Sequence, residues 1–542
     1  MTMLRYFSSK INSVTAAAFL VAISSFASRL LGVLRDRILA GQFGAGTELD
    51  IYYAAFRIPD FLYNLVVLGA LSAGFIPVLT RMIKEGEGRR GGSQEAWRLS
   101  SNIANLLSVV LIAASILAIL FIGPLIRLLT PGFSAEAVAQ TAALSRIMFL
   151  SPLLLGLSGV VGGILQSAKR FFSYSLAPIF YNLGIIAGAL WLAPRLGLAG
   201  LAWGVVIGAA AHLLVQMPAL AKLGFRYRPV LYLRDSATLL IARMTGPRLM
   251  SLAVSQVNLF LVTFLASRLE EGSLSVFNLA NNIQSFPVGI FGISFAIAAF
   301  PALSEAVDDP EALAGRFFAT ARQVLFFVVP VTVMFITLRA QIIRVVLGSG
   351  DFDWQDTIMT MNTLGFFSLS LFAQALLPLL VRVFYAKHDS KTPFYISLAC
   401  VIVNLPLSFY LSSRMGVSGL ALAFSITSIL NFILLWTWLY SSSAHFGAEK
   451  VLPLALKLSL SAIATGIAVQ ISKLLVWRVV DMTTFAGVFS QLAVSVALGG
   501  GAFLLFCWLL DVEEARVVLS ALRRRLPWQK LPDDSHDEVR GL

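Results

Sequence analysis

Long apolar segments constrain this chain more than any other feature. A helix of about 20 apolar residues crosses the hydrocarbon core of a bilayer. Fourteen segments that meet this requirement follow one another along the 542 residues. The sequence therefore predicts an all-α polytopic membrane protein with about 14 transmembrane helices. The segments centre on 13–40, 50–80, 98–128, 138–167, 172–194, 198–222, 240–267, 274–303, 318–346, 358–385, 393–412, 417–440, 453–475 and 485–509.

The distribution of charge supports a membrane protein and orients it. Only 13% of the residues are charged, whereas about 25% is usual for soluble domains. The net charge of +13 comes mainly from short loops, which favours the positive-inside rule over nucleic-acid binding. Both termini are therefore predicted to be cytoplasmic. The basic loops are 80–98, 167–172, 222–235 and 385–391, whereas Glu270 and Glu271 fall on the other side and the acidic loop 304–316 does not fit.

The sequence repeats itself once. "RLGLAGLAWG" at 195–204 matches "RMGVSGLALA" at 414–423, and each follows an "AK" loop. Two six-helix lobes in the same orientation explain the match, and repeated halves are typical of transporters with a substrate site between them. We expect an N-terminal lobe over 1–225, a C-terminal lobe over 226–445, two further helices over 446–510 and a cytoplasmic tail over 511–542.

Charged residues interrupt the first apolar segments. In "SRLLGVLRDRILAGQFGAGTELD" (28–50), Arg29 and Asp36 are seven residues apart, and so are Asp50 and Arg57. That spacing places each pair on one helix face. A charge at the bilayer centre costs about 2.5–3.5 kcal/mol on insertion scales. One interpretation is that these residues form ion pairs or helix caps that only orient helices.

The second interpretation is an anion site. Arg35 lies in the same stretch, and the planar guanidinium group binds phosphate oxygens with two parallel hydrogen bonds. The functional hypothesis is that Arg35 contacts a phosphate group, while Asp36 and Asp50 pair with Arg29 and Arg57. The predicted substrate-binding residues are Arg29, Arg35, Asp36, Asp50, Arg57, Asn281 and Asn282.

Catalytic and metal-binding motifs do not emerge from the sequence. It contains no nucleophile elbow, Walker loop or zinc-ligand spacing. Asp351, Asp353 and Asp356 look like a surface loop, and Cys400 and Cys507 lie in apolar runs. We therefore expect no enzyme, no metal site and no cofactor, although coupling to the membrane potential or to a cation stays open.

Two stretches resemble a known family. "SRLLGVLRDRILAGQFGAGTELDIYYAAFRIPDFL" with "GALSAGFIPVL", and "VFYAKHDSKTP" (383–393), resemble the MurJ/MviN-type lipid II flippases of the multidrug, oligosaccharidyl-lipid and polysaccharide exporter superfamily. The resemblance implies a protein of the bacterial cytoplasmic (inner) membrane, and we expect a monomer. It implies two lobes around a cationic cavity, and last helices that form a lipid-tail groove. It also implies alternating-access export of lipid II, the undecaprenyl-pyrophosphate-linked peptidoglycan precursor. Arg29, Arg35, Asp36 and Asp50 match functional positions, and Arg57 fits a basic position before the proline.

The sequence departs from the family at charged positions. Tyr63, Asn64 and Leu68 stand where the family has arginines and a glutamate, and Asn281, Asn282 and Ser285 replace further charges. Because arginines and glutamates are missing together, the cavity keeps its charge balance. Alternative functions are therefore a flippase for another polyprenyl-pyrophosphate glycan or a drug exporter of the same superfamily.

The repeat places Asn281 at the depth of Arg57. Asn281 and Asn282 are accordingly predicted to face the cavity opposite Arg35 and Arg57. Hydrogen bonding between helices is the alternative role for these amides. Two further classes, a membrane-embedded glycosyltransferase or phosphatase and a non-transporting scaffold, find no support in the pattern of charges.

Overall fold

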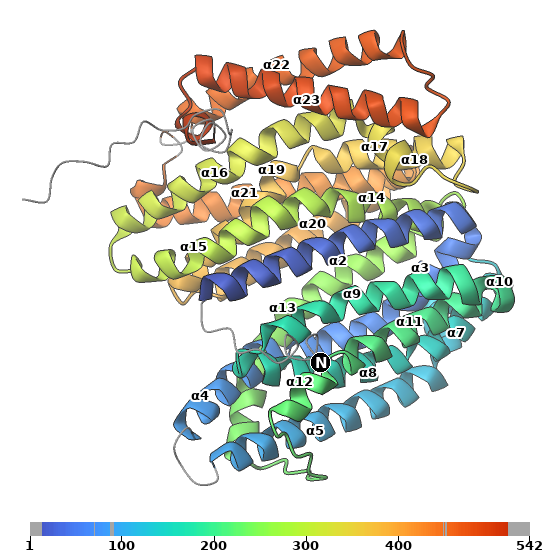
Figure 1. Ribbon diagram of the computed structural model, residues 1–542, viewed down its shortest axis with the longest axis vertical. Coiled ribbons are helices and arrows are strands. Elements are labelled where there is room, and N and C mark those ends of the chain that lie inside the picture. The colour runs from blue at the N-terminus through green and yellow to red at the C-terminus, as the bar shows by residue number, and fades with distance from the viewer. Residues whose placement is uncertain (1–13, 70, 87–91, 448, 450–451, 519–542) are drawn as a thin grey trace, which may run out of the picture. The chain divides into compact units, whose positions relative to one another are not determined.

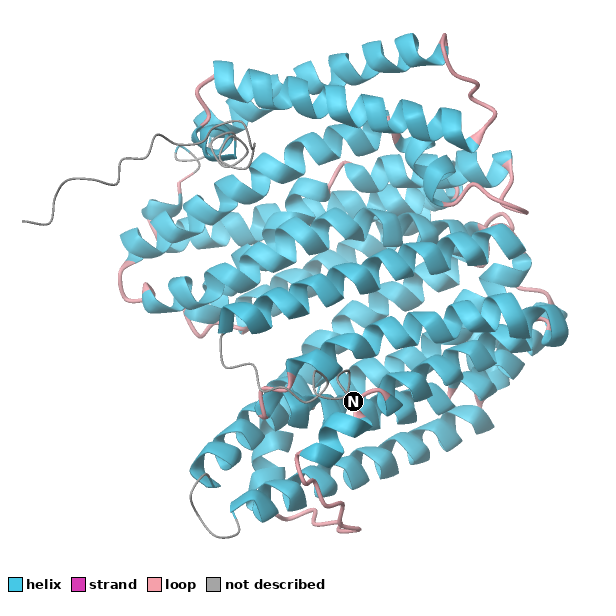
Figure 2. Cartoon of the chain, in the orientation of Figure 1, coloured by secondary structure: helices cyan, strands magenta, loops and turns pink. Residues whose placement is uncertain are grey.

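The computed structural model describes residues 14–69, 71–86, 92–447, 449 and 452–518. Within them all regular elements are helical, and short loops join the helices (Figure 2). The fold class predicted from the apolar segments is therefore confirmed.

The helices up to the middle of the chain follow the predicted segments closely. They are α2 (Val14–Phe43), α3 (Thr47–Leu62), α4 (Ile76–Gly86), α5 (Gly92–Leu120), α6 (Ile122–Leu129), α7 (Ala135–Met148), α8 (Leu150–Ser167), α9 (Phe171–Ala187), α10 (Ala193–Leu196), α11 (Leu198–Leu214), α12 (Met217–Lys222) and α13 (Ser236–Ala266).

The remaining helices continue the same pattern to the end of the described chain. They are α14 (Ser273–Pro287), α15 (Ser294–Glu305), α16 (Pro310–Thr337), α17 (Arg339–Val346), α18 (Trp354–Ser368), α19 (Leu371–Ala386), α20 (Lys391–Met415), α21 (Val417–Ser442), α22 (Leu452–Trp477) and α23 (Phe485–Leu509).

Ten helices in the described part of the chain are long and apolar enough to cross a membrane. The count becomes eleven when α18 and α19, which are bent by 47° at their junction, form one span. The predicted spans 13–40, 50–80 and 240–267 contain α2, α3 with α4, and α13, which lie outside that count. The number fourteen therefore stays a prediction.

Prolines precede π-helical turns after α3 and α14. Pro59 lies near the end of α3, and π-helical turns follow at Tyr63–Leu68 and Leu71–Phe75. Pro287 ends α14, and a π-helical turn follows at Val288–Ile293. A proline lacks the N–H group that would bond to the carbonyl group four residues earlier, so each helix loses one hydrogen bond on the N-terminal side of its proline.

The chain forms two compact units. The first comprises Met1–Phe286, Arg339–Ser370 and Asp389–Leu435, and the second comprises Pro287–Leu338, Leu371–His388 and Trp436–Leu542, as far as these ranges are described. The predicted lobes, divided at residues 225 and 445, are a different partition of the chain and stay a prediction. The part of the predicted cytoplasmic tail after residue 518 lies outside the described residues.

Small residues allow close helix packing in the first unit. In Figure 1, α9 lies beside α2, and α9 also packs on α11. A Cβ atom added at Gly184 of α9 would lie 2.2 Å from the Cα atom of Gly208 in α11. Only glycine fits at such a crossing, which is typical of helix packing in membranes. This crossing fixes α9 and with it the side chain of Asn182.

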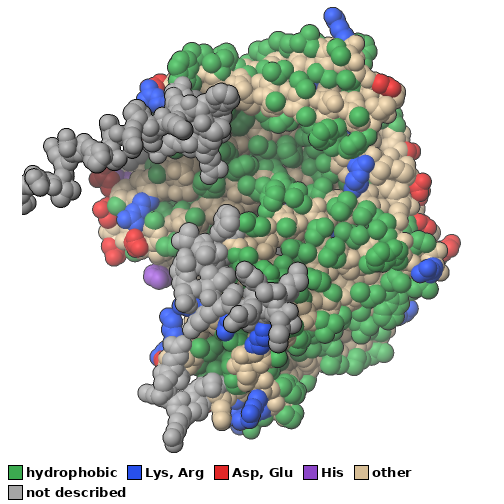
Figure 3. Space-filling view, in the orientation of Figure 1, with side chains coloured by type: hydrophobic (Ala, Val, Ile, Leu, Met, Phe, Trp, Pro, Cys, Tyr) green, Lys and Arg blue, Asp and Glu red, His purple; other side chains and the backbone are tan. Residues whose placement is uncertain are grey.

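The second unit includes the antiparallel pair α22 and α23, which lie side by side (Figure 1). Ser472 of α22 and Ser495 of α23 are joined by a hydroxyl hydrogen bond of 2.7 Å. Large apolar side chains remain exposed on both helices. Hydrophobic side chains cover much of the face seen in Figure 3, as expected for a surface in contact with lipid. The predicted lipid-tail groove on these helices stays a prediction.

Candidate functional site

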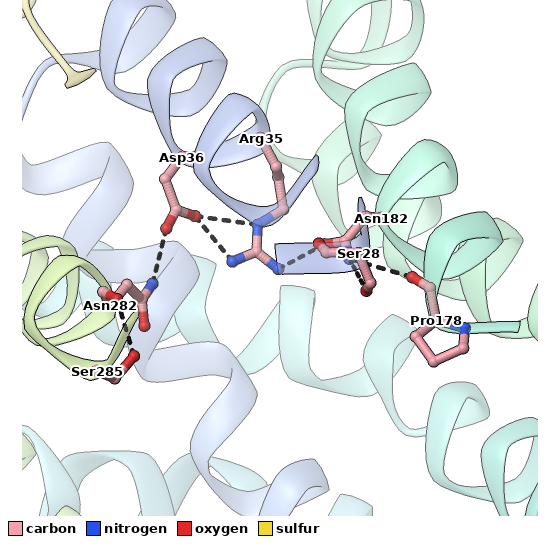
Figure 4. Close-up of polar contacts among 7 residues, drawn as sticks. All are labelled: Ser28, Arg35, Asp36, Pro178, Asn182, Asn282 and Ser285. Atoms are coloured by element: carbon pink, nitrogen blue, oxygen red, sulfur yellow. Dashed lines mark hydrogen bonds and ion pairs between the residues drawn. The ribbon is translucent and has the colours of Figure 1, made fainter. Parts of the chain in front are cut away.

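A cluster of charged and amide side chains lies inside the first unit. Its residues come from α2, α3, α9, α13 and α14, and Figure 4 shows the part around Arg35. Each residue sits in a segment that is otherwise apolar. Because apolar surroundings strengthen electrostatic interactions and penalise unpaired charges, the partners of each group decide what the cluster can do.

Arg35 is held from two directions (Figure 4). Its Nε and Nη2 atoms donate to the Asp36 Oδ1 atom at 3.0 and 2.8 Å, and its Nη1 atom donates to the Asn182 Oδ1 atom at 3.1 Å. The Asn182 amide donates in turn to Ser28 and to the Pro178 carbonyl group. The side chain of Arg35 keeps 23% exposure, so it is only partly buried.

Asp36 links α2 to α14. It is 4% exposed, and its Oδ2 atom accepts a hydrogen bond of 2.8 Å from the Asn282 Nδ2 atom. Asp36 therefore pairs with its neighbour Arg35 rather than with Arg29. The hypothesis of an Arg29–Asp36 pair is wrong, because the guanidinium group of Arg35 turns back along α2 and occupies the carboxylate.

Arg57 lies on α3 and binds neutral partners. Its Nε atom donates to the Thr263 Oγ1 atom and its Nη2 atom to the Asn278 Oδ1 atom, both at 2.8 Å. Asp60 is one turn further along α3 and interacts electrostatically with Arg57 and Arg35. Arg57 is thus oriented without a direct ion pair among the described residues.

Asp50 caps a helix. It is 3% exposed, and its carboxylate accepts hydrogen bonds from the N–H groups of Gly272 and Ser275, at 3.0 and 2.7 Å, and from the Ser275 hydroxyl group. These groups lie at the start of α14, where N–H groups lack partners within the helix. The hypothesis of an Asp50–Arg57 pair is wrong, because the carboxylate satisfies these donors instead. Substrate binding by Asp50 stays a prediction.

The structure separates the other predicted site residues. Arg29 is exposed and takes part in no ion pair within the described chain. Asn281 accepts a hydrogen bond from Gln284 of its own helix at 3.0 Å. Asn282 contacts Asp36, whereas Asn278, one turn earlier, contacts Arg57. Arg57 therefore contacts Asn278 rather than Asn281, and the placement of Asn281 in the cavity stays a prediction.

Four polar residues of the cluster escaped the sequence-based selection: Asn182, Asn278, Asp60 and Thr263. The spacing of Asn278 and Asn282 by four residues places both on one face of α14, and this signal could have identified Asn278. Asp60 follows Arg57 by three residues and could have been found in the same way. Nothing local distinguishes Asn182 or Thr263 from ordinary polar residues in an apolar helix.

A second set of contacts ties the ends of helices together in the first unit. Arg37 donates to the carbonyl groups of Val345 at 2.6 Å and of Val346 and Gly348 at 3.4 Å, so it caps the carboxyl end of α17. Glu271 accepts hydrogen bonds from the hydroxyl and N–H groups of Thr47. These hydrogen bonds hold the pKa of the Glu271 carboxyl group below its ordinary value.

The acidic loop residues also have structural roles. Asp353 and Asp356 form a capping box at the start of α18, and Asp356 Oδ2 accepts from the Ala45 N–H group at 2.9 Å. In the described residues no group of three or more His, Cys, Asp or Glu side chains could hold a metal ion.

The cluster around Arg35 and Arg57 can bind an anion. A guanidinium group has five N–H donors, and contacts in the described chain use three of those of Arg35 and two of those of Arg57. The remaining donors suit a group rich in acceptor oxygens, such as a phosphate or pyrophosphate. The carboxylate of Asp36 pairs with Arg35, and Asp60 interacts electrostatically with both arginines.

Comparison with known families identifies long matches. The model of a family described as lipid II flippase MurJ matches residues 39–489. A protein of Vibrio cholerae named probable lipid II flippase MurJ is 29% identical over 503 residues, which cover 89% of this chain and 96% of that protein. The protein of the same name from Thermotoga maritima is 30% identical over 414 residues, covering 76% and 83%.

Solved structures show the same fold. A structure of lipid II flippase MurJ in an inward closed conformation has a TM-score of 0.73 and 23% identity, and the match covers 93% of this chain and all of that chain. An inward-facing multidrug resistance transporter of the MATE family has a TM-score of 0.63 and 16% identity over 77% of this chain and 95% of that chain.

Proposed function

The chain belongs to the MurJ family of lipid II flippases, and we propose that it moves lipid II from the cytoplasmic to the outer leaflet by alternating access. The family resemblance inferred from the sequence is thereby confirmed. The family consists of transporters, and we propose that this chain is not an enzyme. We further place it in the bacterial cytoplasmic membrane as a monomer with both termini in the cytoplasm.

One observation carries the proposed mechanism. Arg35 and Arg57 lie in apolar helices and keep N–H donors that the described chain does not use. A pyrophosphate group offers the oxygens that these donors need. In our proposal it replaces Asp36 as the partner of Arg35 when substrate enters, and Asp36 takes Arg35 back after release. The carboxylate thus keeps the arginine oriented between cycles.

The other polar residues take supporting roles in this proposal. Asn282 holds Asp36 by a hydrogen bond of 2.8 Å, and Asn278 and Thr263 hold Arg57. Arg29, which is exposed, is proposed to meet the substrate first. Coupling of transport to the membrane potential or to a cation is a further part of the proposal.

The test is depletion of the protein in its host, followed by identification of the lipid-linked precursor that accumulates in the inner leaflet. The proposal is supported if lipid II accumulates on depletion, if the wild-type protein reverses this accumulation, and if the Arg35→Ala variant does not. Accumulation of a different polyprenyl-pyrophosphate glycan would favour the alternative, for which the neutral residues Asn282 and Ser285 are the motive. Unchanged precursor pools would contradict both.

A further inference from the structure

Two arginines outside the candidate site line a cavity on the surface of the first unit. Arg127 lies in the last turn of α6 and Arg146 in the last turn of α7. Together with Gly123, Pro124 and one face of α7 they enclose a cavity of about 710 Å³. Both arginine side chains are exposed, so the cavity opens to the surroundings of the protein.

Both arginines lack an acidic partner within the described part of the chain. None of the ion pairs among the described residues includes Arg127 or Arg146. The nearest acidic residue in the sequence, Glu136, accepts a hydrogen bond from Gln140 on its own helix. The cavity therefore carries two positive charges that no acidic side chain of the described residues pairs with.

The position of α6 places this cavity at the boundary of the membrane. The span from Gln94 to Leu120 contains 27 residues, which are about 40 Å long at 1.5 Å per residue. The hydrocarbon core is about 30 Å thick. Because α6 starts directly after this span, α6 with Arg127, and Arg146 in the same cavity, lie at the level of lipid headgroups.

An apolar groove adjoins the basic cavity. It has a volume of about 850 Å³ and is lined by side chains of α3, α5, α6, α13 and α20. Leu128 of α6 belongs to the walls of both spaces. The groove wall is almost entirely hydrocarbon, including Phe61, Leu117 and Phe260, so an acyl chain fits it chemically.

We propose that the basic cavity and the apolar groove together form a binding site for an anionic membrane phospholipid. The phosphate group binds Arg127 and Arg146, whose guanidinium groups suit phosphate oxygens. One acyl chain crosses Leu128 and lies in the groove. The charge of the site selects an anionic lipid over a zwitterionic one, and the site is independent of the proposed transport of lipid II.

The test is titration of the purified full-length protein, in an uncharged detergent, with phosphatidylglycerol or phosphatidylcholine, and measurement of bound lipid by native mass spectrometry. We expect saturable binding of about one phosphatidylglycerol, and roughly tenfold weaker binding in the double variant Arg127→Gln/Arg146→Gln. The variant Arg127→Lys/Arg146→Lys keeps the charge and should lose less.

Arg195→Gln is the matched control. Arg195 is exposed and lies outside both spaces. Arg195 lies at the same end of the first unit as α6. Between them the chain crosses the unit once through α7 and α8 and returns through α9 and α10. This variant should bind phosphatidylglycerol like the wild-type protein. An equal loss in Arg195→Gln and in the double variant would mean nonspecific charge attraction and would overturn the proposal.

Two filling variants test the geometry without changing charge. Ala139→Phe fills the basic cavity from an exposed position on α7, and Ala114→Phe fills the groove. Both should weaken binding of phosphatidylglycerol. Unchanged binding in Ala139→Phe would overturn the headgroup site, and unchanged binding in Ala114→Phe would overturn the placement of the acyl chain.

Discussion

The internal repeat allows two equivalent regions of the first unit to be compared. "SLAPIFYNL" at 175–183 in α9 recurs as "SLACVIVNL" at 397–405 in α20. In the first region Asn182 accepts a hydrogen bond from Arg35 of α2 at 3.1 Å. In the second, Asn404 donates to Asn258 of α13 at 2.6 Å. Asparagines at equivalent positions of the repeat therefore bind an arginine in one half and an amide in the other.

This difference shows which polar groups the packing of the helices requires and which it does not. Asn404 also accepts hydrogen bonds from Ser408 and Thr427, both at 3.3 Å, so neutral groups alone satisfy this buried junction. A charge is thus unnecessary for packing helices at this place in the repeat. Arg35 and its partner Asp36 exceed what the fold requires, and we attribute the excess to binding of the substrate pyrophosphate.

The largest effect is expected when the charge in the first region is removed. Arg35→Ala should abolish complementation of a depleted host, because the loss of a charge-assisted contact of about 2–3 kcal/mol weakens binding roughly 30- to 150-fold. Arg35→Lys should rescue transport only in part, because an ammonium group lacks the planar fork. Asn258→Ala in the second region is the matched control and should retain most transport. Near-normal transport by Arg35→Ala would remove Arg35 from the site.

The ion pair beside this junction should dominate stability in the first region. Asp36→Asn leaves Arg35 without a carboxylate in apolar surroundings and should lower the free energy of unfolding by about 3–5 kcal/mol. The double variant Arg35→Gln/Asp36→Asn should be less destabilised than the sum of its single variants. Denaturation of the four proteins of this double-mutant cycle measures the coupling, and strictly additive changes would count against the pair.

A new cation at the end of the cluster sharpens the comparison further. Asn282→Arg would compete with Arg35 for Asp36 and release the Arg35 donors. We expect the variant to fold, to bind lipid II a few-fold more tightly, by about 1 kcal/mol, and to transport it more slowly. Titration with lipid II and a transport assay test this. Loss of folded protein would show that position 282 is packed against another helix.

Asp50→Asn addresses a carboxylate that the structure assigns to a helix end. The variant should lower the free energy of unfolding by about 1–2 kcal/mol, because the cap of α14 weakens, while transport per folded molecule stays near the wild-type value. Thermal melting and transport are compared on the same preparation. Lost transport with unchanged melting would instead place Asp50 among the substrate-binding residues.

The smallest effect concerns Glu271 in the loop between α13 and α14. Hydrogen bonds from Thr47 lower the pKa of its carboxyl group from the ordinary value of 4.5. This contact therefore stabilises the protein above pH 4.5 and is lost as the pH falls through the lowered pKa. Glu271→Gln should melt slightly below the wild-type protein at pH 7, and the difference should shrink under acid conditions. A difference that grows with acidity would contradict this assignment.

The sequence predicted the class of fold because each apolar segment carries its own signal. It also located Arg35, Asp36 and Arg57, since charges in apolar segments demand partners. It failed to pair them correctly, because a spacing of seven residues reports a shared face and not the direction of a flexible side chain. Asn182 is 147 positions from Arg35, and a contact of that range depends on how α9 packs on α2.

The most direct test of the central claim is the affinity for lipid II of the purified double variant Arg35→Gln/Asp36→Asn. This variant gives the first region the neutral character of the second. We predict a melting temperature close to that of the wild-type protein, since the two new amides leave no unpaired charge and can hydrogen-bond to each other, to Asn182 and to Asn282. The affinity for lipid II should fall at least about tenfold. A well-folded double variant that binds and transports lipid II like the wild-type protein would contradict the account.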